Sequence, residues 1–393
     1  MSDESNQLKL AQQGGIGFIG QFTDKVLSFA YLSVMARLID PVLFGTYLLA
    51  FSIVSFVSGF SDLNTYKSIS YFVPKYMTKS KKAEASGVLS QVTIITLFLT
   101  TISFVALFFL ADIISVRVFS KPNLTKPIIY LSILVVITSS FRIVINTFSA
   151  LKKMEYRVAI YDIYYPASRL LLSAAFVIKG FDVLGLVYAQ IIASLSSLVI
   201  SLVLLYISSP WMFRIGEREQ EVTDLLAYSG PLALSATIYS FINQIDFFII
   251  GYHLAADSVS TYKIGFQFGS TVLVFLAAFN PIIKPFVSEL ADDSSLLNER
   301  YYTLTRWIVG LSLPPFITII SYPKTYISVL FSEAYSSGWI VLIIILTGYW
   351  VYIAVGPTRV TLEGLGNSRI VFVNSALIMV INTIIGITLV PQL

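Results

Sequence analysis

Residues 91–110 have the sequence Gln-Val-Thr-Ile-Ile-Thr-Leu-Phe-Leu-Thr-Thr-Ile-Ser-Phe-Val-Ala-Leu-Phe-Phe-Leu and carry no charge. About 20 apolar residues in a helix cross the hydrocarbon core of a bilayer. The run is too long and too little alternating for a strand of a membrane barrel. A helix also satisfies each backbone N–H and C=O within its own segment, as lipid requires. The stretch therefore predicts a membrane-spanning helix.

Similar apolar runs recur along the whole chain. They predict an all-α polytopic membrane protein with eleven spans, at about residues 14–36, 43–61, 86–110, 127–150, 159–178, 183–207, 227–251, 260–280, 304–322, 338–357 and 369–390.

The composition agrees with a membrane protein and excludes several other classes. Of the 393 residues, 56% are hydrophobic and 12% are charged, and the mean hydropathy is +0.80. An ordinary soluble domain is about 25% charged, so a soluble enzyme and a disordered protein are excluded. The net charge of +4 lies in loops rather than in a basic patch, and we expect no nucleic-acid partner. Because there is no Cys and His253 is the single histidine, we expect no metal site and no cofactor.

Lys and Arg residues predict the orientation of the chain. With a cytoplasmic N-terminus, 16 of them fall in inside segments and 6 in outside segments, which agrees with the positive-inside rule. Residues 1–13 are polar and lack the apolar core of a signal peptide. We therefore expect a multi-pass protein of the cell (cytoplasmic) membrane with its N-terminus in the cytoplasm.

A weak internal repeat suggests two bundles. The turn at 36–47 aligns with 252–262, where a polar residue and Leu precede a short acidic turn, a small residue, Thr and Tyr. Six spans precede the second copy, so both units start on the cytoplasmic side, an arrangement known in transporters. We predict a cytoplasmic tail at 1–13, a six-helix bundle at 14–207, a cytoplasmic linker at 208–226 and a second, pseudo-symmetric bundle at 227–393.

Four motifs in this order resemble the polysaccharide (lipid-linked oligosaccharide) flippases of the multidrug/oligosaccharidyl-lipid/polysaccharide exporter superfamily. The resemblance covers nearly the whole chain. The motifs are Ala36-Arg37-Leu38-Ile39-Asp40-Pro41 with Phe44-Gly45-Thr46-Tyr47, Gln244-Ile245-Asp246 with Ile249-Ile250-Gly251, Gly364-Leu365-Gly366-Asn367-Ser368-Arg369, and the segment from Asn382 to Pro391.

The resemblance also sets an expectation for the C-terminal end. Family members usually continue after the proline that matches Pro391 with a twelfth span and often two more. This chain ends at Leu393. We therefore expect the second bundle to be incomplete, with one to three helices beyond the eleven spans.

Three cations within predicted spans are candidates for a substrate cavity: Lys25, Arg142 and Arg169. A charge near the bilayer centre costs roughly 2.5–3.5 kcal/mol or more, so it usually faces a cavity or a partner. The resemblance implies a lipid-linked sugar on a polyprenyl phosphate or diphosphate, and a guanidinium grips phosphate at two points. The alternatives are an ion pair that fixes packing for Lys25 and snorkelling to the interface for Arg142.

Further polar residues extend this predicted site. Lys263 and Gln267 lie four residues apart and form a polar stripe that could face the cavity. Asp24, Asp246 and Asn243 are candidates for coupling to H⁺ or Na⁺, and the resemblance to multidrug-extrusion relatives supports this role for Asp24. The alternative for Asp24, as for Lys25, is an ion pair between helices that fixes packing. The alternative for Asp246 and Asn243 is hydrogen bonding between helices. Gly14, Gly15, Gly17 and Gly20 we interpret as small residues that allow close helix packing.

Three functions compete. The first is a flippase that moves lipid-linked sugar units across the membrane by alternating access of two bundles, with the carrier and membrane lipids as partners. The second is a cation-coupled multidrug exporter of the same superfamily, whose cavity we expect to be acidic and aromatic rather than cationic. The third, a membrane enzyme such as a sugar polymerase, is disfavoured because no large external loop or acidic catalytic motif is present. We therefore expect a transporter rather than an enzyme.

Overall fold

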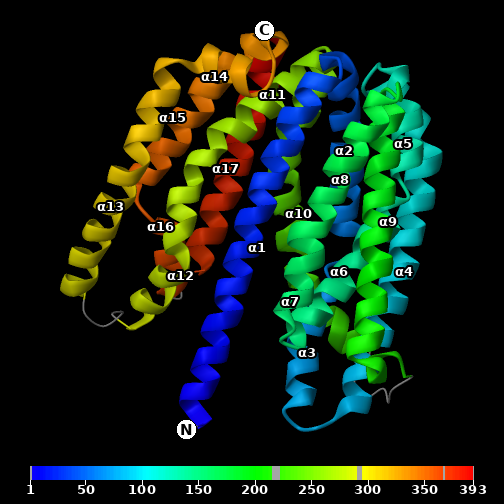
Figure 1. Cartoon of the computed structure of the whole chain (residues 1–393), viewed down its shortest axis with the longest axis vertical. Helices are drawn as coiled ribbons and strands as arrows, with labels where there is room; N and C mark the ends of the chain where they lie inside the picture. Colours follow the sequence, from blue (N-terminus) through cyan, green and yellow to red (C-terminus); the bar gives the residue numbers. More distant parts are fainter. Residues whose placement is uncertain (1, 215–221, 290–293, 366–367, 393) are drawn as a thin grey trace. The chain divides into compact units, whose positions relative to one another are not determined.

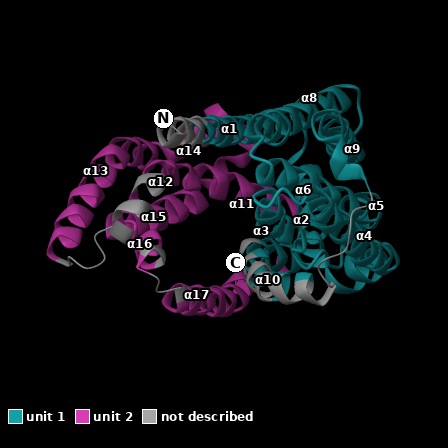
Figure 2. Cartoon of the chain, turned by 90° about the horizontal axis from the view of Figure 1, so that it is seen from below, with its two compact units in different colours: residues 1–252 teal, residues 253–393 magenta. Residues whose placement is uncertain are grey.

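The structure, a computed structural model, describes residues 2–214, 222–289, 294–365 and 368–392, and these are helical with short connections (Figure 1). No strand occurs in these ranges. The chain divides into two compact units, unit 1 at Met1–Tyr252 and unit 2 at His253–Leu393 (Figure 2). The prediction of an all-α membrane protein is confirmed, because the described residues form helices and no strands.

Unit 1 contains long helices interrupted by short irregular turns of helix. The α-helices are α1 (Ser2–Leu38), α2 (Pro41–Ser61), α3 (Tyr66–Met77), α4 (Lys82–Asp112), α5 (Thr125–Leu131), α6 (Leu134–Ala150), α7 (Met154–Arg157), α8 (Tyr165–Ile178), α9 (Val183–Ser208) and α10 (Val222–His253). Two segments are π-helical, η1 (Ile113–Val118) and η3 (Val158–Tyr164), and two are 3₁₀, η2 (Pro122–Leu124) and η4 (Pro210–Phe213).

Unit 2 has the same all-helical character. Its α-helices are α11 (Ala256–Gly269), α12 (Leu273–Glu289), α13 (Ser294–Ser321), α14 (Pro323–Leu330), α15 (Trp339–Val355), α16 (Thr358–Gly364) and α17 (Ser368–Leu389), with 3₁₀ turns η5 (Ser270–Val272), η6 (Glu333–Gly338) and η7 (Val390–Gln392). Gly356 has φ 95°, which ends α15 and lets the chain begin α16 two residues later.

Eight helical segments of the described chain are long and apolar enough to span a membrane, and they match eight of the eleven predicted spans. They are Pro41–Ser61, Lys82–Val118, Pro122–Ala150, Val183–Ser208, Ala256–Phe279, Ser295–Ser321, Glu333–Val355 and Arg369–Gln392. The other three predicted spans fall in α1, in η3 with α8, and in α10, which are also helical. The total number of spans stays a prediction.

The division into units falls after Tyr252, later than the predicted linker at 208–226, of which 215–221 lie outside the described residues. The reason is that α10 packs on α2 within unit 1. The Phe56 ring meets Phe241 and Phe248 edge-on, at centroid distances of 6.0 and 5.5 Å. The predicted bundle limits, 14–207 and 227–393, stay a prediction.

The turn between α1 and α2 is stabilised by the side chains of its own residues. The Asp40 side chain accepts hydrogen bonds from the backbone N–H groups of Val42 and Leu43, at 2.8 and 3.4 Å. Pro41 occupies the first helical position, where its missing N–H costs nothing. The Asp-Pro pair of the first motif therefore defines where α2 begins.

Close packing of α1 depends on one glycine. A Cβ at Gly20 would lie 2.7 Å from Oδ2 of Asp162 and 2.7 Å from a methyl group of Val158. At Gly17 the nearest atom is Cε of Met154, at 3.5 Å, and at Gly15 nothing lies within 4 Å. The predicted role of these glycines in close helix packing is therefore confirmed at Gly20, where α1 meets η3.

The burial pattern of unit 1 is that of a protein in lipid. Its interior contains many small hydroxyl side chains with no exposed surface, among them Thr96, Thr100, Ser139, Ser197 and Ser201. Large apolar side chains point outward instead, with Phe109 exposed to 74% and Phe98 to 65%. Small polar residues inside and apolar residues outside are typical of packed transmembrane helices.

Candidate substrate cavity

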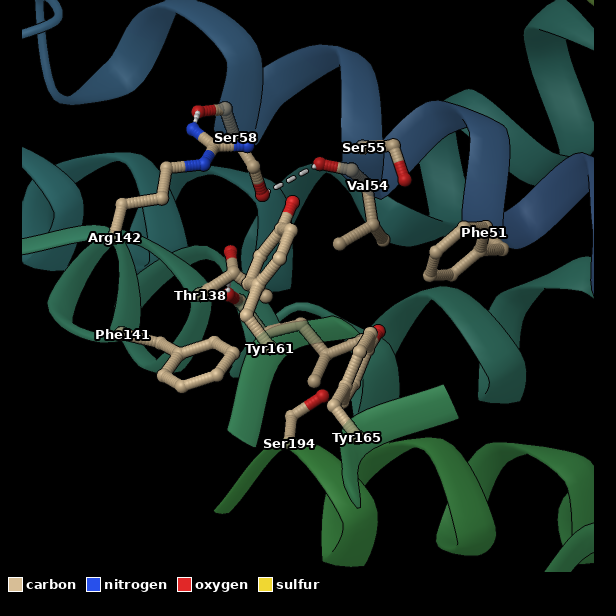
Figure 3. A pocket seen from close by; sticks show the side chains of 11 residues that line it. Phe51, Val54, Ser55, Ser58, Thr138, Phe141, Arg142, Tyr161, Tyr165 and Ser194 are labelled. Atoms are coloured by element: carbon tan, nitrogen blue, oxygen red, sulfur yellow. Dashed lines mark hydrogen bonds between the residues drawn. The ribbon is translucent and has the colours of Figure 1, made fainter. Parts of the chain in front are cut away.

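Unit 1 contains a cavity bounded by α2, α6, the η3–α8 segment and α9 (Figure 3). It encloses about 660 Å³ of space, part of it open to solvent. Aromatic rings, small hydroxyl groups and one cation line it: Phe51, Val54, Ser55, Ser58, Leu134, Thr138, Phe141, Arg142, Tyr161, Tyr165 and Ser194. No acidic side chain is among these lining residues.

Arg142 is held against the end of α2. Its Nη1 donates to the backbone carbonyl oxygen of Ser58 at 3.0 Å and to Oδ2 of Asp62 at 3.3 Å. The carbonyl oxygens in the last turn of a helix lack intrahelical partners, and a cation there also interacts favourably with the helix dipole. α2 thus supplies partners for Arg142, and its role in substrate binding and the alternative of snorkelling both stay predictions.

Asp62 is fully buried and organises the turn that follows α2. Its Oδ1 accepts a hydrogen bond from the backbone N–H of Asn64 at 2.9 Å. Leu63 and Asn64 both have positive φ, 47° and 52°, a left-handed conformation that side chains seldom adopt. The carboxylate therefore fixes an unusual turn and orients the Arg142 guanidinium at the same time.

A further cation lies close to this ion pair. Burial lowers the pKa of Lys67, on α3, while the Asp62 carboxylate acts to raise it and the Arg142 charge to lower it. Burial of the ammonium group is the largest of these effects and sets the direction, and the Asp62 carboxylate acts on Lys67 more strongly than the Arg142 charge does. Arg142 and Lys67 thus lie near a single carboxylate, that of Asp62.

The π-helical turn η3 brings the tyrosines of the cavity together. The N–H of Tyr165 reaches the carbonyl oxygen of Ile160, five residues back, instead of the usual four. Such a widened turn changes which side chains share a face, and π-turns are frequent at functional sites. Tyr161 and Tyr165 both line the cavity, and Tyr161 remains 39% exposed (Figure 3).

Arg169 lies among tyrosines rather than in the cavity lining. Its Cζ is 4.1 Å from the centroid of the Tyr31 ring and 6.0 Å from that of Tyr165. A guanidinium over an aromatic face gains cation–π attraction, which compensates in part for its lost hydration. Its Nε is buried and has no hydrogen-bond partner within the described part of the chain.

A hydrogen-bonded chain connects this tyrosine cluster to the cavity. The Tyr47 hydroxyl donates to Oε1 of Gln190 at 3.2 Å. Nε2 of Gln190 donates to the Tyr165 hydroxyl at 2.7 Å and to Oγ of Ser194 at 3.3 Å. Gln190 is fully buried on α9 and holds two tyrosines, Tyr47 and Tyr165, through one hydrogen bond each.

Among the sequence-predicted residues of α1, Asp24 and Lys25 have different surroundings. Asp24 is half-buried and interacts electrostatically with Arg169 and with Asp162 of η3. Asp162 is 3% exposed, and its Oδ2 has no hydrogen-bond partner among the described residues. Lys25 is exposed and lines neither cavity described for unit 1. Asp24 thus interacts electrostatically with Arg169 of α8 as well as with its chain neighbour Lys25.

The remaining predicted residues lie on α10 and α11. Asp246 is half-buried on α10, while the side chain of Asn243 lies outside the described residues. Lys263 and Gln267 are half-buried, one turn apart on α11 of unit 2. Their roles in substrate binding and ion coupling stay predictions.

Several residues of the site were missed by reasoning from the sequence. Asp62 sits at the boundary of a predicted inside loop, where an acidic residue is ordinary. Asp162 carried a signal that was overlooked, because it is a carboxylate inside an apolar run, as Asp24 is. Tyr161 and Tyr165 could not be separated from the other tyrosines of the chain.

Solved structures with the same fold are membrane transporters. A multidrug resistance MATE family transporter of the MOP superfamily, in an inward-facing conformation, has a TM-score of 0.75 at 13% identity, covering 91% of this chain and 84% of that chain. The lipid II flippase MurJ, inward closed, has a TM-score of 0.70 at 14% identity, covering 95% and 81%. The MATE multidrug transporter DinF-BH has a TM-score of 0.63 at 14% identity, covering 93% and 85%. No curated protein sequence matches the chain.

The fold is therefore the one that these solved MOP superfamily structures share. The model of the family described as polysaccharide biosynthesis protein matches residues 34–339. The chain belongs to this family. The superfamily resemblance read from the motifs is confirmed.

Proposed function

We propose that this protein is a flippase that translocates a lipid-linked, phosphate-bearing saccharide across the cytoplasmic membrane. The observation that carries the proposal is the cavity of unit 1, in which Tyr161 and Tyr165 stand beside hydroxyl groups and the Arg142 guanidinium, with no acidic lining residue. Aromatic faces suit the apolar faces of sugar rings, hydroxyls suit their OH groups, and a guanidinium suits phosphate.

The second candidate, a cation-coupled multidrug exporter, is less well supported by this lining. A cavity that selects lipophilic cations should offer carboxylates, or aromatic faces with no protein cation beside them. The cavity of unit 1 offers a guanidinium instead, and Lys67 adds positive charge near it. A positive potential attracts phosphate and repels cationic drugs.

Ion coupling belongs to the same proposal. Asp24 and Asp162 are carboxylates in two predicted spans of unit 1 that interact electrostatically, and Oδ2 of Asp162 is buried with no hydrogen-bond partner among the described residues. Two like charges close together favour the uptake of a proton or a cation by the pair. We propose that Asp24 and Asp162 bind H⁺ or Na⁺, and that Arg169 responds to the charge of Asp24. Transport would then alternate between inward and outward access without covalent chemistry.

The test is complementation of a flippase-deficient strain by the full-length protein, with surface polysaccharide as the readout. We expect Tyr161→Ala to reduce surface polysaccharide at least threefold at equal protein level, because it removes a ring from the cavity. Tyr161→Phe should keep most activity if the ring makes the main contact. Tyr164→Ala is the matched control, since Tyr164 is an exposed neighbour on η3 that does not line the cavity.

Two results would overturn the proposal. One is full rescue by both Tyr161→Ala and Arg142→Gln. The other is a protein that fails to restore surface polysaccharide but lowers the accumulation of a lipophilic fluorescent cation in whole cells. The second result would favour the exporter.

A further inference from the structure

A second pocket of unit 1 adjoins the cavity of Figure 3, because Arg142 and Tyr161 line both of them. It encloses about 560 Å³, part of it open to solvent, and is more polar than the first. Its other lining residues include Tyr66, Asn146, Ser149 and Arg157. The pocket therefore has two arginines and no carboxylate in its lining.

The Arg142 guanidinium at this pocket is held in place by protein contacts. Both of its protein contacts use Nη1, toward Ser58 and Asp62. A guanidinium has five N–H donors. Nε and Nη2 donate no hydrogen bond to the described residues, so three N–H groups remain for a ligand. Because Asp62 is buried and accepts from Asn64 as well, the guanidinium is fixed before any ligand arrives.

Arg157 supplies the second cation. It is the last residue of α7, directly before the π-turn, and it is half-buried. Its guanidinium donates no hydrogen bond to the part of the chain that the structure describes. The acidic group with which it interacts electrostatically is Asp162, which does not line the pocket. A partly buried guanidinium with unused donors is costly unless a ligand or water satisfies them.

The smaller polar groups of the pocket are largely committed. Asn146 donates through Nδ2 to the carbonyl oxygen of Arg142 at 2.8 Å and accepts from Ser70 at 3.3 Å. The Tyr66 hydroxyl donates to Asn64 at 3.0 Å. The Tyr161 hydroxyl makes no hydrogen bond to the described residues. The available donors are thus two guanidinium groups and one phenol.

We propose that this second pocket is a phosphate subsite, in which Arg142 and Arg157 clamp a phosphate monoester or diphosphate and the Tyr161 hydroxyl donates to it. Two forked donors and a third hydroxyl match the several oxygens of a tetrahedral dianion. A carboxylate, with two oxygens, would occupy a single guanidinium. The subsite rests in part on the proposed function, because the shared Arg142 and Tyr161 would let the saccharide occupy the first cavity while its phosphate occupies the second.

The test measures binding directly, using the full-length protein purified in detergent. Inorganic pyrophosphate is titrated by calorimetry, and a farnesyl diphosphate titration forms the second arm. If the subsite recognises only the phosphate groups, we expect saturable binding of pyrophosphate and of farnesyl diphosphate. If it also requires the lipid, we expect the farnesyl compound to bind more tightly. Arg157→Ala should weaken binding at least tenfold, and Arg157→Lys should recover part of the loss.

The controls separate a binding defect from a folding defect. Arg214→Ala removes an exposed arginine of unit 1 that lines neither pocket and should bind like the wild type. The thermal melting point of each variant is measured in the same detergent. Unchanged affinity in Arg157→Ala, or no saturable binding of either probe by the wild type, would overturn the subsite. Binding that depends on Arg157 in a protein without flippase activity in cells would support the subsite and contradict the proposed function.

Discussion

Nη1 of Arg142, on α6, lies 3.3 Å from Oδ2 of Asp62, 80 residues earlier in the chain and fully buried at the end of α2. This ion pair ties the strained turn after α2 to the two pockets of unit 1. Arg142 thus has two tasks, since it caps α2 with one nitrogen and presents the others to the cavity.

The first prediction concerns this pair. Arg142→Gln leaves the Asp62 carboxylate buried without its cation, and breaking a buried pair costs about 3–5 kcal/mol. Because the Arg142 side chain is 33% exposed, we expect a smaller loss, about 2–3 kcal/mol. The measurement is thermal unfolding in one detergent. Asp62→Asn combined with Arg142→Gln should recover part of the loss, and a wild-type melting curve for Arg142→Gln alone would show that the pair is not structural.

The second prediction concerns the contact of α1 with η3. Gly20→Ala places a Cβ 2.7 Å from the Asp162 carboxylate and the Val158 side chain, so one helix must shift. We expect a destabilisation of about 1–3 kcal/mol, as for overpacking in a core. Gly15→Ala is the matched control, because nothing lies within 4 Å of the new methyl group. Equal melting points for the two variants would contradict the close approach at Gly20.

The third prediction concerns the buried amide between the tyrosines. Gln190→Leu removes the partner of the Tyr47 hydroxyl and of the Tyr165 hydroxyl. Each unsatisfied buried polar group costs about 1–3 kcal/mol, so the melting point should fall. Gln190→Glu keeps the acceptor for Tyr47 but loses the donor to Tyr165. Its melting point should therefore lie between those of the wild type and Gln190→Leu. If Gln190→Leu is as stable as the wild type, the hydrogen-bonded chain contributes nothing to folding.

The fourth prediction concerns the break between α15 and α16 in unit 2. Gly356 has φ 95°, and a Cβ there would meet the hydroxyl groups of Tyr301 and Thr305. We expect Gly356→Ala to cost at least about 1–2 kcal/mol from the backbone conformation alone. Gly348→Ala, inside α15 and without an atom within 4 Å, should be neutral or stabilising. The readout is the fraction of protein that stays monodisperse after heating, and identical fractions for both variants would refute the strain at Gly356.

Much of the fold was accessible from the apolar pattern. Charge-free runs of about 20 residues can satisfy their backbone only as helices in lipid, and eight predicted spans match long apolar helices. The pattern could not predict η3, because hydropathy does not distinguish a π-turn from a turn of α-helix. The same limit applies to α10, whose packing on α2 shifts the boundary of unit 1 to Tyr252.

The candidate site was predictable only in part. Arg142 was predicted because a guanidinium inside a span is costly unless it faces a cavity or a partner. Its partner Asp62 was not, since a carboxylate at a loop boundary looks solvated when only the sequence is known. Arg169, found by the same reasoning as Arg142, proves to lie over the Tyr31 ring, at 4.1 Å. Reasoning from single charges therefore finds cations in spans but does not tell which of them reach a cavity.

The sequence by itself determined that this protein is helical and has apolar runs long enough to span a membrane, because hydropathy is a local property of the chain. The tertiary structure alone decided which polar groups meet. Arg142 with Asp62 and Tyr47 with Gln190 each join distant segments, 80 and 143 residues apart. Such pairs depend on which helix faces turn toward each other, and that is set by close packing over the whole unit.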